Sequence, residues 1–233
     1  MKNNFKFPML KSERIAGAAY LPIHIFLLPL ILGYTGLLAR MNIELSDAAV
    51  NLVYYMISFV FILIFMLRYL KASFSDMLSK PLNALKAVIL AYFMNYFLVM
   101  GVSFLLAFLL PDAMNPNTRE IIRQTKLDTN VTAFVAVLLA PIVEESLFRG
   151  VLFGTIRGKS RTAAYVISAL VFAVYHLWQY FVIGLDWTVL VYLLQYIPAS
   201  VALCWCYEKS GTIWASIVLH AAINVISISI TFG

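Results

Sequence analysis

Two adjacent glutamates and an arginine lie in an otherwise apolar stretch of the chain, residues 131–156; they are Glu144, Glu145 and Arg149. A charge at the centre of a bilayer costs about 2.5–3.5 kcal/mol on insertion scales, so such residues are rare and indicate function by default. Glu145 and Arg149 are four residues apart and share a helix face. An ion pair between them would lower the cost of burying both. Glu144 points about 100° away on a helix and stays available to another partner.

Two later apolar segments carry polar side chains at helical spacing. His176 follows Phe172 by four residues, and Asn224 follows His220 by four, so each pair lies on one face of its helix. In one possible chemistry, Glu144 with His176 takes a proton from water. His220 and Asn224 then donate hydrogen bonds to an oxyanion. In the other, Glu144, His176 and His220 bind Zn²⁺, which lowers the pKa of a bound water to about 7.

A proline and two glycines near the acidic stretch predict a local distortion of the helix and close helix packing. Pro141 lacks a backbone donor and frees the carbonyl of Val137, so a kink there would open space beside Glu144. Gly150 and Gly154 form a small face that allows another helix to approach closely.

The elements that position these residues are membrane spans. The chain has 233 residues, of which 63% are hydrophobic and 12% charged, and this composition excludes an ordinary soluble domain. We expect an all-α polytopic membrane bundle forming a single domain, 1–233, with its catalytic core at about 118–226. The alternative is eight spans, if the first or the fourth is broken. Residues 117–126 are predicted to form a short surface helix. Seven segments are long enough to cross a hydrocarbon core of about 30 Å: 15–39, 48–67, 87–110, 131–156, 162–183, 188–207 and 212–230.

The distribution of basic residues predicts the orientation. With the N-terminus in the cytoplasm, cytoplasmic segments carry twelve Lys or Arg and external segments carry four. This is the positive-inside pattern of a multi-pass cell-membrane protein in contact with the lipid bilayer, not a nucleic-acid-binding surface. The topology also places Glu144, His176, His220 and Asn224 roughly 12–21 Å from the cytoplasmic edge, at 1.5 Å per residue. Three spans therefore bring polar groups to one layer.

Each of these residues also has a purely structural interpretation. A Glu–Arg pair can join helices without doing chemistry, and a single histidine in a span more often forms a hydrogen bond between helices. We assign His24 to that second class, although its depth would allow it to line a cavity. Cys204 and Cys206 lie in one apolar segment and read as reduced packing residues.

The three motifs together resemble those of the CPBP family, the type II CAAX prenyl proteases and bacteriocin-processing or immunity membrane proteins, also called Abi. The resemblance covers about 118–226 and implies a helical intramembrane endopeptidase with a cavity open toward the cytoplasm. It implies that Glu144 is the catalytic base and that His176 helps to activate water. It assigns His220 and Asn224 to the oxyanion. Supporting roles fall to the remaining motif residues, Glu145, Arg149 and Phe172.

A metal-free mechanism is preferred over zinc, because asparagine is a poor zinc ligand. The expected substrate is a membrane-associated peptide or protein, and the implied roles are peptide maturation, processing of signalling peptides or bacteriocins, and self-immunity. Two alternatives stay open. One is a non-catalytic membrane immunity or partner protein. The other is a proton-coupled transporter, which the lack of an internal repeat and of acidic residues in other spans disfavours.

Overall fold

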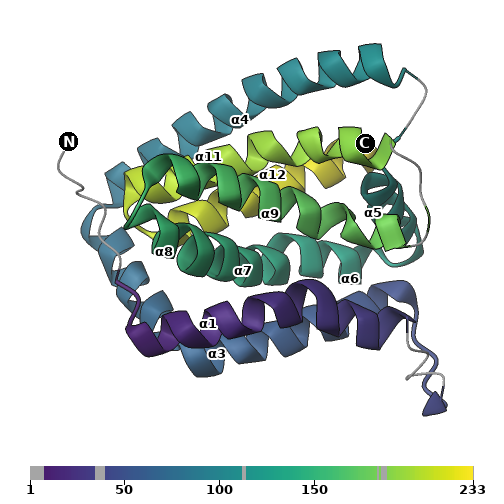
Figure 1. Ribbon diagram of the computed structural model, residues 1–233, viewed down its shortest axis with the longest axis horizontal. Helices are drawn as coiled ribbons and strands as arrows, with labels where there is room; N and C mark the ends of the chain where they lie inside the picture. The colour runs from purple at the N-terminus through teal and green to yellow at the C-terminus, as the bar shows by residue number, and fades with distance from the viewer. Residues whose placement is uncertain (1–7, 35–39, 112–113, 183, 185–187, 233) are drawn as a thin grey trace.

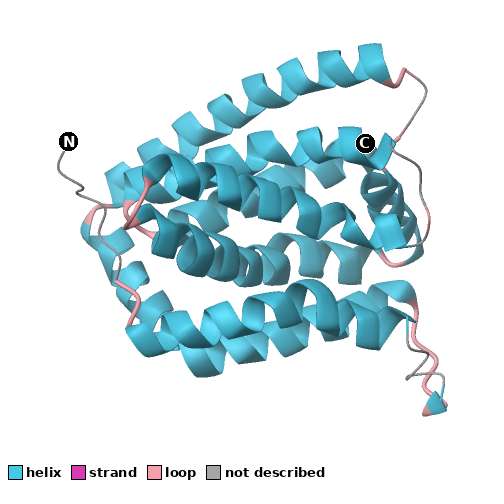
Figure 2. Cartoon of the chain, viewed as in Figure 1, coloured by secondary structure: helices cyan, strands magenta, loops and turns pink. Residues whose placement is uncertain are grey.

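Every regular element that the structure describes is a helix. The computed structural model describes residues 8–34, 40–111, 114–182, 184 and 188–232, and Figure 2 shows helices joined by short loops in this part of the chain. The all-α prediction is therefore confirmed. A shorter apolar helix, Ile213–Ser229, accompanies six helices that are long and apolar enough to cross a membrane: Lys11–Gly33, Asp47–Ser79, Pro81–Leu109, Thr129–Arg157, Arg161–Val182 and Thr188–Ser210. Together they match the seven predicted spans.

Several spans are composite, because the helical geometry changes along them. Segments η1 to η4 are π-helical and η5 is a 3₁₀ turn. In chain order the elements are α1 (Lys11–Pro22), η1 (Ile23–Leu27), η2 (Leu30–Tyr34), α3 (Asp47–Ser79), α4 (Pro81–Leu109), α5 (Pro116–Leu127), α6 (Thr129–Phe134), η3 (Val135–Leu139), α7 (Ala140–Glu144), η4 (Glu145–Phe153), α8 (Gly154–Arg157), α9 (Arg161–Val182), α10 (Thr188–Tyr192), η5 (Leu193–Gln195), α11 (Tyr196–Ser210) and α12 (Ile213–Phe232).

Helix α3 extends well beyond the predicted span of 48–67. Residues 68–79 are more polar but contain no glycine or proline, so nothing in them stops the helix. Its 33 residues are about 50 Å long, which exceeds a bilayer core. The break comes at Lys80, with φ −141° and ψ 55°, because the following Pro81 disfavours the helical conformation in the residue before it. Pro81 then starts α4, six residues before the predicted start.

The first span and the surface helix follow the predictions more closely. Lys11–Gly33 forms one span, which changes to π-helix after Pro22, while residues 35–39 of the predicted span lie outside the described residues. The expected surface helix is α5. Asn115 caps its N-terminus by accepting a hydrogen bond from the Asn117 amide, 2.9 Å away.

The acidic stretch lies at the centre of the bundle. Figure 1 shows α1 and α3 side by side along one edge and α4 along the opposite edge, where it packs against α11 and α12. The fourth span, Thr129–Arg157, runs between these edges and is the most buried of the six. Its charged residues are therefore surrounded by other helices and not by lipid.

Glycines allow close packing between the fourth span and the N-terminal part of the chain. A β-carbon on Gly150 would lie 3.2 Å from side-chain atoms of Met9 and Tyr69, so the close approach expected at Gly150 is present. The contact at Gly17 of α1 is tighter. There, a β-carbon would lie 2.4 Å from Cγ2 of Val151, which is buried and, being β-branched, has little freedom to turn away.

We predict that Gly17→Ala lowers the free energy of unfolding by about 1–3 kcal/mol, the usual cost of overpacking. The double variant Gly17→Ala with Val151→Ala should recover part of the loss, because it removes the methyl group that the new β-carbon meets. Gly101→Ala on α4 is the matched control, since its β-carbon would meet nothing within 4 Å. Thermal unfolding in detergent measures all three, and equal midpoints for the two single variants would contradict the prediction.

Candidate active site

The backbone of the fourth span is irregular where it carries the acids. A single α-helical turn, α7, ends at Glu144 and is enclosed by the π-helical segments η3 and η4. At the end of η3, the Ala140 amide donates to the carbonyl of Val135, five residues earlier. The next donor in this register would be the amide of residue 141, but proline has none. The carbonyl of Ala136 therefore needs a donor from elsewhere.

Asn224 of α12 supplies that donor. Its Nδ2 donates to the carbonyl oxygen of Ala136 at 2.7 Å. The sequence correctly indicates that Pro141 frees a carbonyl, but the π-helical register moves it from Val137 to Ala136. A carboxamide carries two N–H groups. One of them anchors Asn224 to the fourth span, which leaves the other for a ligand.

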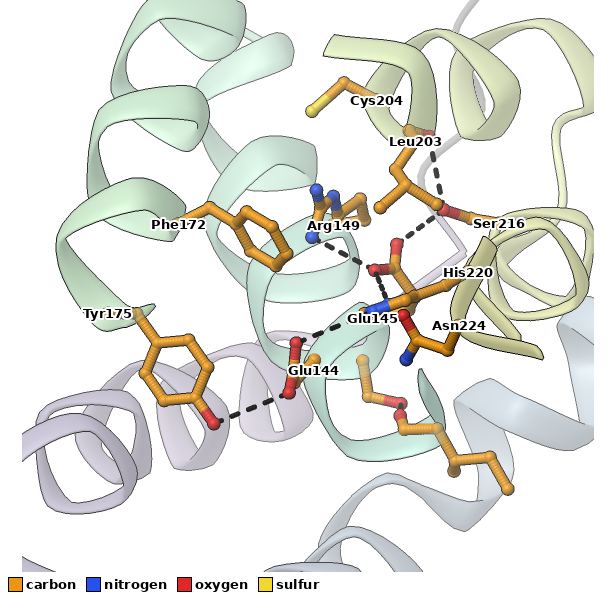
Figure 3. Close-up of polar contacts among 12 residues, drawn as sticks. Glu144, Glu145, Arg149, Phe172, Tyr175, Leu203, Cys204, Ser216, His220 and Asn224 are labelled. Carbon is orange, nitrogen blue, oxygen red and sulfur yellow. Dashed lines mark hydrogen bonds and ion pairs between the residues drawn. The ribbon is translucent and has the colours of Figure 1, made fainter. Parts of the chain in front are cut away.

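Glu145 is the most heavily bonded acid of the site. It is completely buried, and its Oε1 lies 3.0 Å from Arg149 Nη1 and 2.9 Å from His220 Nδ1. Its Oε2 accepts a hydrogen bond from Ser216 Oγ at 2.5 Å. Figure 3 shows this carboxylate between Arg149 and Ser216, whereas Glu144 points toward Tyr175. Glu145 thus joins η4 to α12.

Phe172 of α9 encloses the cluster from another side. Its ring lies under the buried guanidinium of Arg149, with Cζ 4.2 Å from the ring centroid, in cation–π geometry. The same ring makes an edge contact with the imidazole of His220, at 6.1 Å between centroids. Its centroid also lies 4.5 Å from that of His176. Phe172 therefore shields the ionic cluster and packs against both site histidines.

Glu144 has one bonded and one open carboxylate oxygen. Oε1 accepts a hydrogen bond from the Tyr55 hydroxyl at 2.6 Å and lies 3.5 Å from the Tyr175 hydroxyl. Oε2 is buried and has no hydrogen-bond partner among the described residues. It lies 3.9 Å from His220 Nε2. The two oxygens of Glu144 therefore differ: one is held by tyrosine hydroxyls and the other has no donor in the described part of the chain.

Both site histidines are oriented through Nδ1. An acceptor faces this atom in each case: a carboxylate oxygen of Glu145 for His220, and the carbonyl of Phe172, at 2.8 Å, for His176. Nδ1 therefore carries the proton in both rings, and Nε2 is the nitrogen left for chemistry. The ring of His176 is also stacked on Tyr196, with centroids 4.4 Å apart.

One cavity of about 530 Å³ contains the four predicted catalytic residues, Glu144, His176, His220 and Asn224. The predicted supporting residues Glu145, Arg149 and Phe172 do not line it and lie behind it. The cavity extends from Glu144 toward the end of the bundle at which α3 starts and α5 lies, the right-hand end in Figure 1. Polar side chains line that end: Asp47, Asn51, Asn117, Glu120, Arg123 and Gln124.

Comparison with known proteins identifies the segment that holds this site. Residues 126–226 match the family described as type II CAAX prenyl endopeptidase Rce1-like. This segment is therefore similar to the Rce1-like family. The match confirms the predicted resemblance, and its bounds are close to those expected, about 118–226. All seven predicted site residues lie within the matched segment, which we call the Rce1-like segment.

Two curated relatives come from Lactococcus lactis subsp. lactis (strain IL1403). The UPF0177 protein YxdF is 32% identical over 92 residues, which cover 40% of this chain and 45% of that protein. The UPF0177 protein YaiF is 31% identical over 119 residues, which cover 47% of this chain and 48% of that protein. The chain thus spans about half the length of the curated relatives it matches. No solved structure matches it.

The residues of the zinc alternative do not converge on one point. In the described part of the Rce1-like segment, no group of three His, Cys, Asp or Glu side chains is placed to hold a metal ion. Glu144 and His220 approach each other, but His176 does not complete a set with them.

The sequence did not reveal three residues that contact the two glutamates. Ser216 lies four residues before His220 on the same helix face, and this spacing could have drawn attention to it. Tyr55 and Tyr175 donate toward Glu144 from α3 and α9. Tyrosines are common in membrane proteins, and nothing in their spacing separates these two from the interfacial ones.

We predict that Arg149→Met lowers the free energy of unfolding by about 3–5 kcal/mol, because it leaves the buried Glu145 carboxylate without its cation. Arg123→Met is the control, since it removes an arginine that pairs with Glu120 and Asp47 at the surface. Unfolding in detergent monitored by tryptophan fluorescence compares the two variants. The interpretation of Glu145 and Arg149 as a structural pair is wrong if both variants unfold at the midpoint of the parent protein.

Proposed function

We propose that the protein is an intramembrane endopeptidase that hydrolyses a peptide bond without a metal. The observation that carries this proposal is the open Oε2 of Glu144, buried inside a polar cavity and 3.9 Å from His220 Nε2. A buried carboxylate oxygen without a donor is costly unless a ligand or water satisfies it. A cavity of about 530 Å³ falls within the range of small-ligand sites and suits a short stretch of extended peptide.

In the proposed reaction, a water is held between Glu144 Oε2 and His176. Glu144 takes one proton as the water oxygen attacks the carbonyl carbon, and the carbonyl oxygen becomes an oxyanion. The tetrahedral intermediate then loses the amide nitrogen. The proton on Glu144 passes to that nitrogen, so the products are a free amine and a new carboxyl group.

In this proposal, His220 and Asn224 stabilise the oxyanion. Nδ1 of His220 donates to Glu145, so a protonated imidazole would present its second N–H, at Nε2, to the cavity. The N–H of Asn224 that does not bond to Ala136 is a second donor. Preorganised donors of this kind are usually the largest single contribution to such catalysis.

The proposed substrate is a membrane-associated peptide or protein, and the proposed roles are peptide maturation, processing of signalling peptides or bacteriocins, and self-immunity. We predict that Glu144→Gln abolishes cleavage while the protein remains folded, because an amide cannot accept the proton of water. Glu44→Gln is the matched control at an exposed glutamate outside the cavity. Mass spectrometry compares the membrane peptides of cells that carry each variant at equal levels.

Peptides made by the wild type and by Glu44→Gln, but not by Glu144→Gln, identify the cleaved bond. Repeating the reaction with a chelator tests the metal-free mechanism, which predicts no loss of rate. Identical peptide profiles in all three strains, with the biological phenotype intact in Glu144→Gln, would reject the protease and favour a non-catalytic immunity or partner protein.

We further propose that the N-terminus is cytoplasmic and that the cavity therefore opens on the opposite face of the membrane. Among the described residues, the cavity end carries four Lys or Arg, whereas the other end carries ten. Arg123, one of the four, is paired with Glu120 and Asp47, which raise the pKa of its guanidinium above the ordinary value. The family resemblance implies a cytoplasmic opening. With the site at this end of the bundle, that expectation and a cytoplasmic N-terminus cannot both hold.

Single cysteines test the orientation. We predict that a membrane-impermeant maleimide labels Glu44→Cys, at the cavity end, in intact cells and labels Lys159→Cys, at the other end, only after lysis. Both positions are exposed, and the native Cys204 and Cys206 are completely buried, so the parent protein is the blank. The reverse labelling pattern would place the cavity on the cytoplasmic side and the N-terminus outside.

A further inference from the structure

A chain of hydroxyl groups connects Glu144 to a histidine of the first span. The Tyr55 hydroxyl lies 2.6 Å from Glu144 Oε1 and 3.0 Å from the hydroxyl of Tyr175. The Tyr175 hydroxyl lies 3.2 Å from that of Tyr54, which in turn lies 3.0 Å from His24 Nε2. Three phenols from α3 and α9 thus separate the proposed catalytic base from His24 in η1.

Ser58 fixes His24, at the end of this series of hydrogen bonds that is farthest from Glu144. Its hydroxyl donates to the Tyr54 carbonyl at 3.1 Å and accepts from the Tyr20 hydroxyl at 3.0 Å. The proton between Ser58 and His24 Nδ1, 2.9 Å apart, must therefore belong to the imidazole. Neutral His24 then has Nε2 as an acceptor. It is completely buried, as is Ser58, and forms the interhelical hydrogen bond expected from the sequence.

This arrangement determines which hydroxyl in the series donates and which accepts. Both acceptors that take the Tyr54 proton belong to His24: Nε2, and the backbone carbonyl at 2.9 Å. The Tyr55 proton goes to Glu144. The hydroxyl oxygens of Tyr54 and Tyr55 can therefore act toward Tyr175 only as acceptors. The Tyr175 hydroxyl, which lies between them, is the donor. Whichever oxygen Tyr175 donates to, it cannot draw the Tyr55 proton away from Glu144.

We propose that Tyr55 and Tyr175 are positioning residues for Glu144, and that Tyr54 and His24 hold them in place. This inference rests on the proposed role of Glu144 as the base. Tyr55 satisfies Oε1, which fixes the rotation of the carboxylate and leaves Oε2 as the oxygen that faces His220 and the water. Without that hydrogen bond the carboxylate can rotate, and either oxygen can turn away from the substrate.

Burial supports a use for these hydroxyls beyond packing. Tyr54 and Tyr55 are both 8% exposed, and phenylalanine would fill the same space without a polar atom that needs a partner. Three hydroxyls in one connected chain, all lining the cavity and ending on its open acid, exceed what packing requires. A connected network of this kind can contribute more than its separate pairs, because each hydrogen bond polarises the next.

The test compares phenylalanine variants at four tyrosines. Tyr69→Phe is the control, since Tyr69 is also on α3, is completely buried, and bonds through its hydroxyl to Tyr207 at 3.1 Å. The substrate is the precursor peptide whose cleavage by the wild type depends on Glu144. We expect Tyr55→Phe to lower kcat about 10- to 100-fold, the range for a hydrogen bond to a charged group, with KM within about twofold. Tyr175→Phe and then Tyr54→Phe should have progressively smaller effects, and Tyr69→Phe none.

Infrared spectroscopy provides a readout that needs no substrate. The carboxylate bands of Glu144 are obtained as the difference between the wild type and Glu144→Gln. We expect Tyr55→Phe, but not Tyr69→Phe, to shift these bands. The inference is overturned if Tyr55→Phe keeps the wild-type kcat and bands, or if Tyr69→Phe loses as much activity. A wild type that cleaves no peptide rejects the protease instead, while the infrared comparison still decides whether Tyr55 holds Glu144.

Discussion

The buried carboxylate of Glu145 is the interaction on which the site depends. Taking a carboxylate and a guanidinium out of water costs several kcal/mol each, and only close pairing with further hydrogen bonds repays that cost. Glu145 obtains this from Arg149 on its own span and from Ser216 and His220 on α12. The same bonds therefore satisfy the charge, join the two spans and fix the ring of His220. Loss of any one of them would change both stability and site geometry.

Adjacent positions in the sequence give the two glutamates opposite roles. Every partner of Glu145 is a donor that holds it still, whereas Glu144 keeps one oxygen open in the cavity. Two neighbouring carboxyl groups can differ in this way because a helix turns them to different surroundings. In a soluble enzyme, bulk water could solvate both. Inside a membrane bundle the protein must supply each donor, so the donors determine which acid keeps an oxygen without a partner.

The irregular backbone of the fourth span belongs to the same design. A carbonyl without a donor is expensive in a bilayer, and it is tolerated only where the protein supplies a partner. Pro141 and the π-helical register leave the carbonyl of Ala136 free, and Asn224 satisfies it. Asn224 is thereby held at the cavity wall, next to His220 on its own helix. π-helical turns are frequent at functional sites, and here the turn has an identifiable effect.

The sequence predicted the parts of the site that depend on charge and helical spacing. Burial of Glu144, Glu145 and Arg149 is costly enough to stand out in an apolar stretch, and the four-residue spacing placed His220 and Asn224 on one face. Helix ends that depend on tertiary packing were less predictable, as the extension of α3 to Ser79 shows.

The roles of these tyrosines could not be predicted, because an uncharged phenol packs readily in lipid or in protein and its position forms no recognisable pattern in the sequence. Tyr55 acquires its role only when α3 and α9 bring three connected hydroxyls together beside Glu144. In the proposed function, the family motifs therefore account for the groups that would act on the peptide bond. The direction in which Glu144 presents its open oxygen depends instead on α1 and α3, which lie outside the Rce1-like segment. It follows that the N-terminal spans help to build the active site as well as to enclose it.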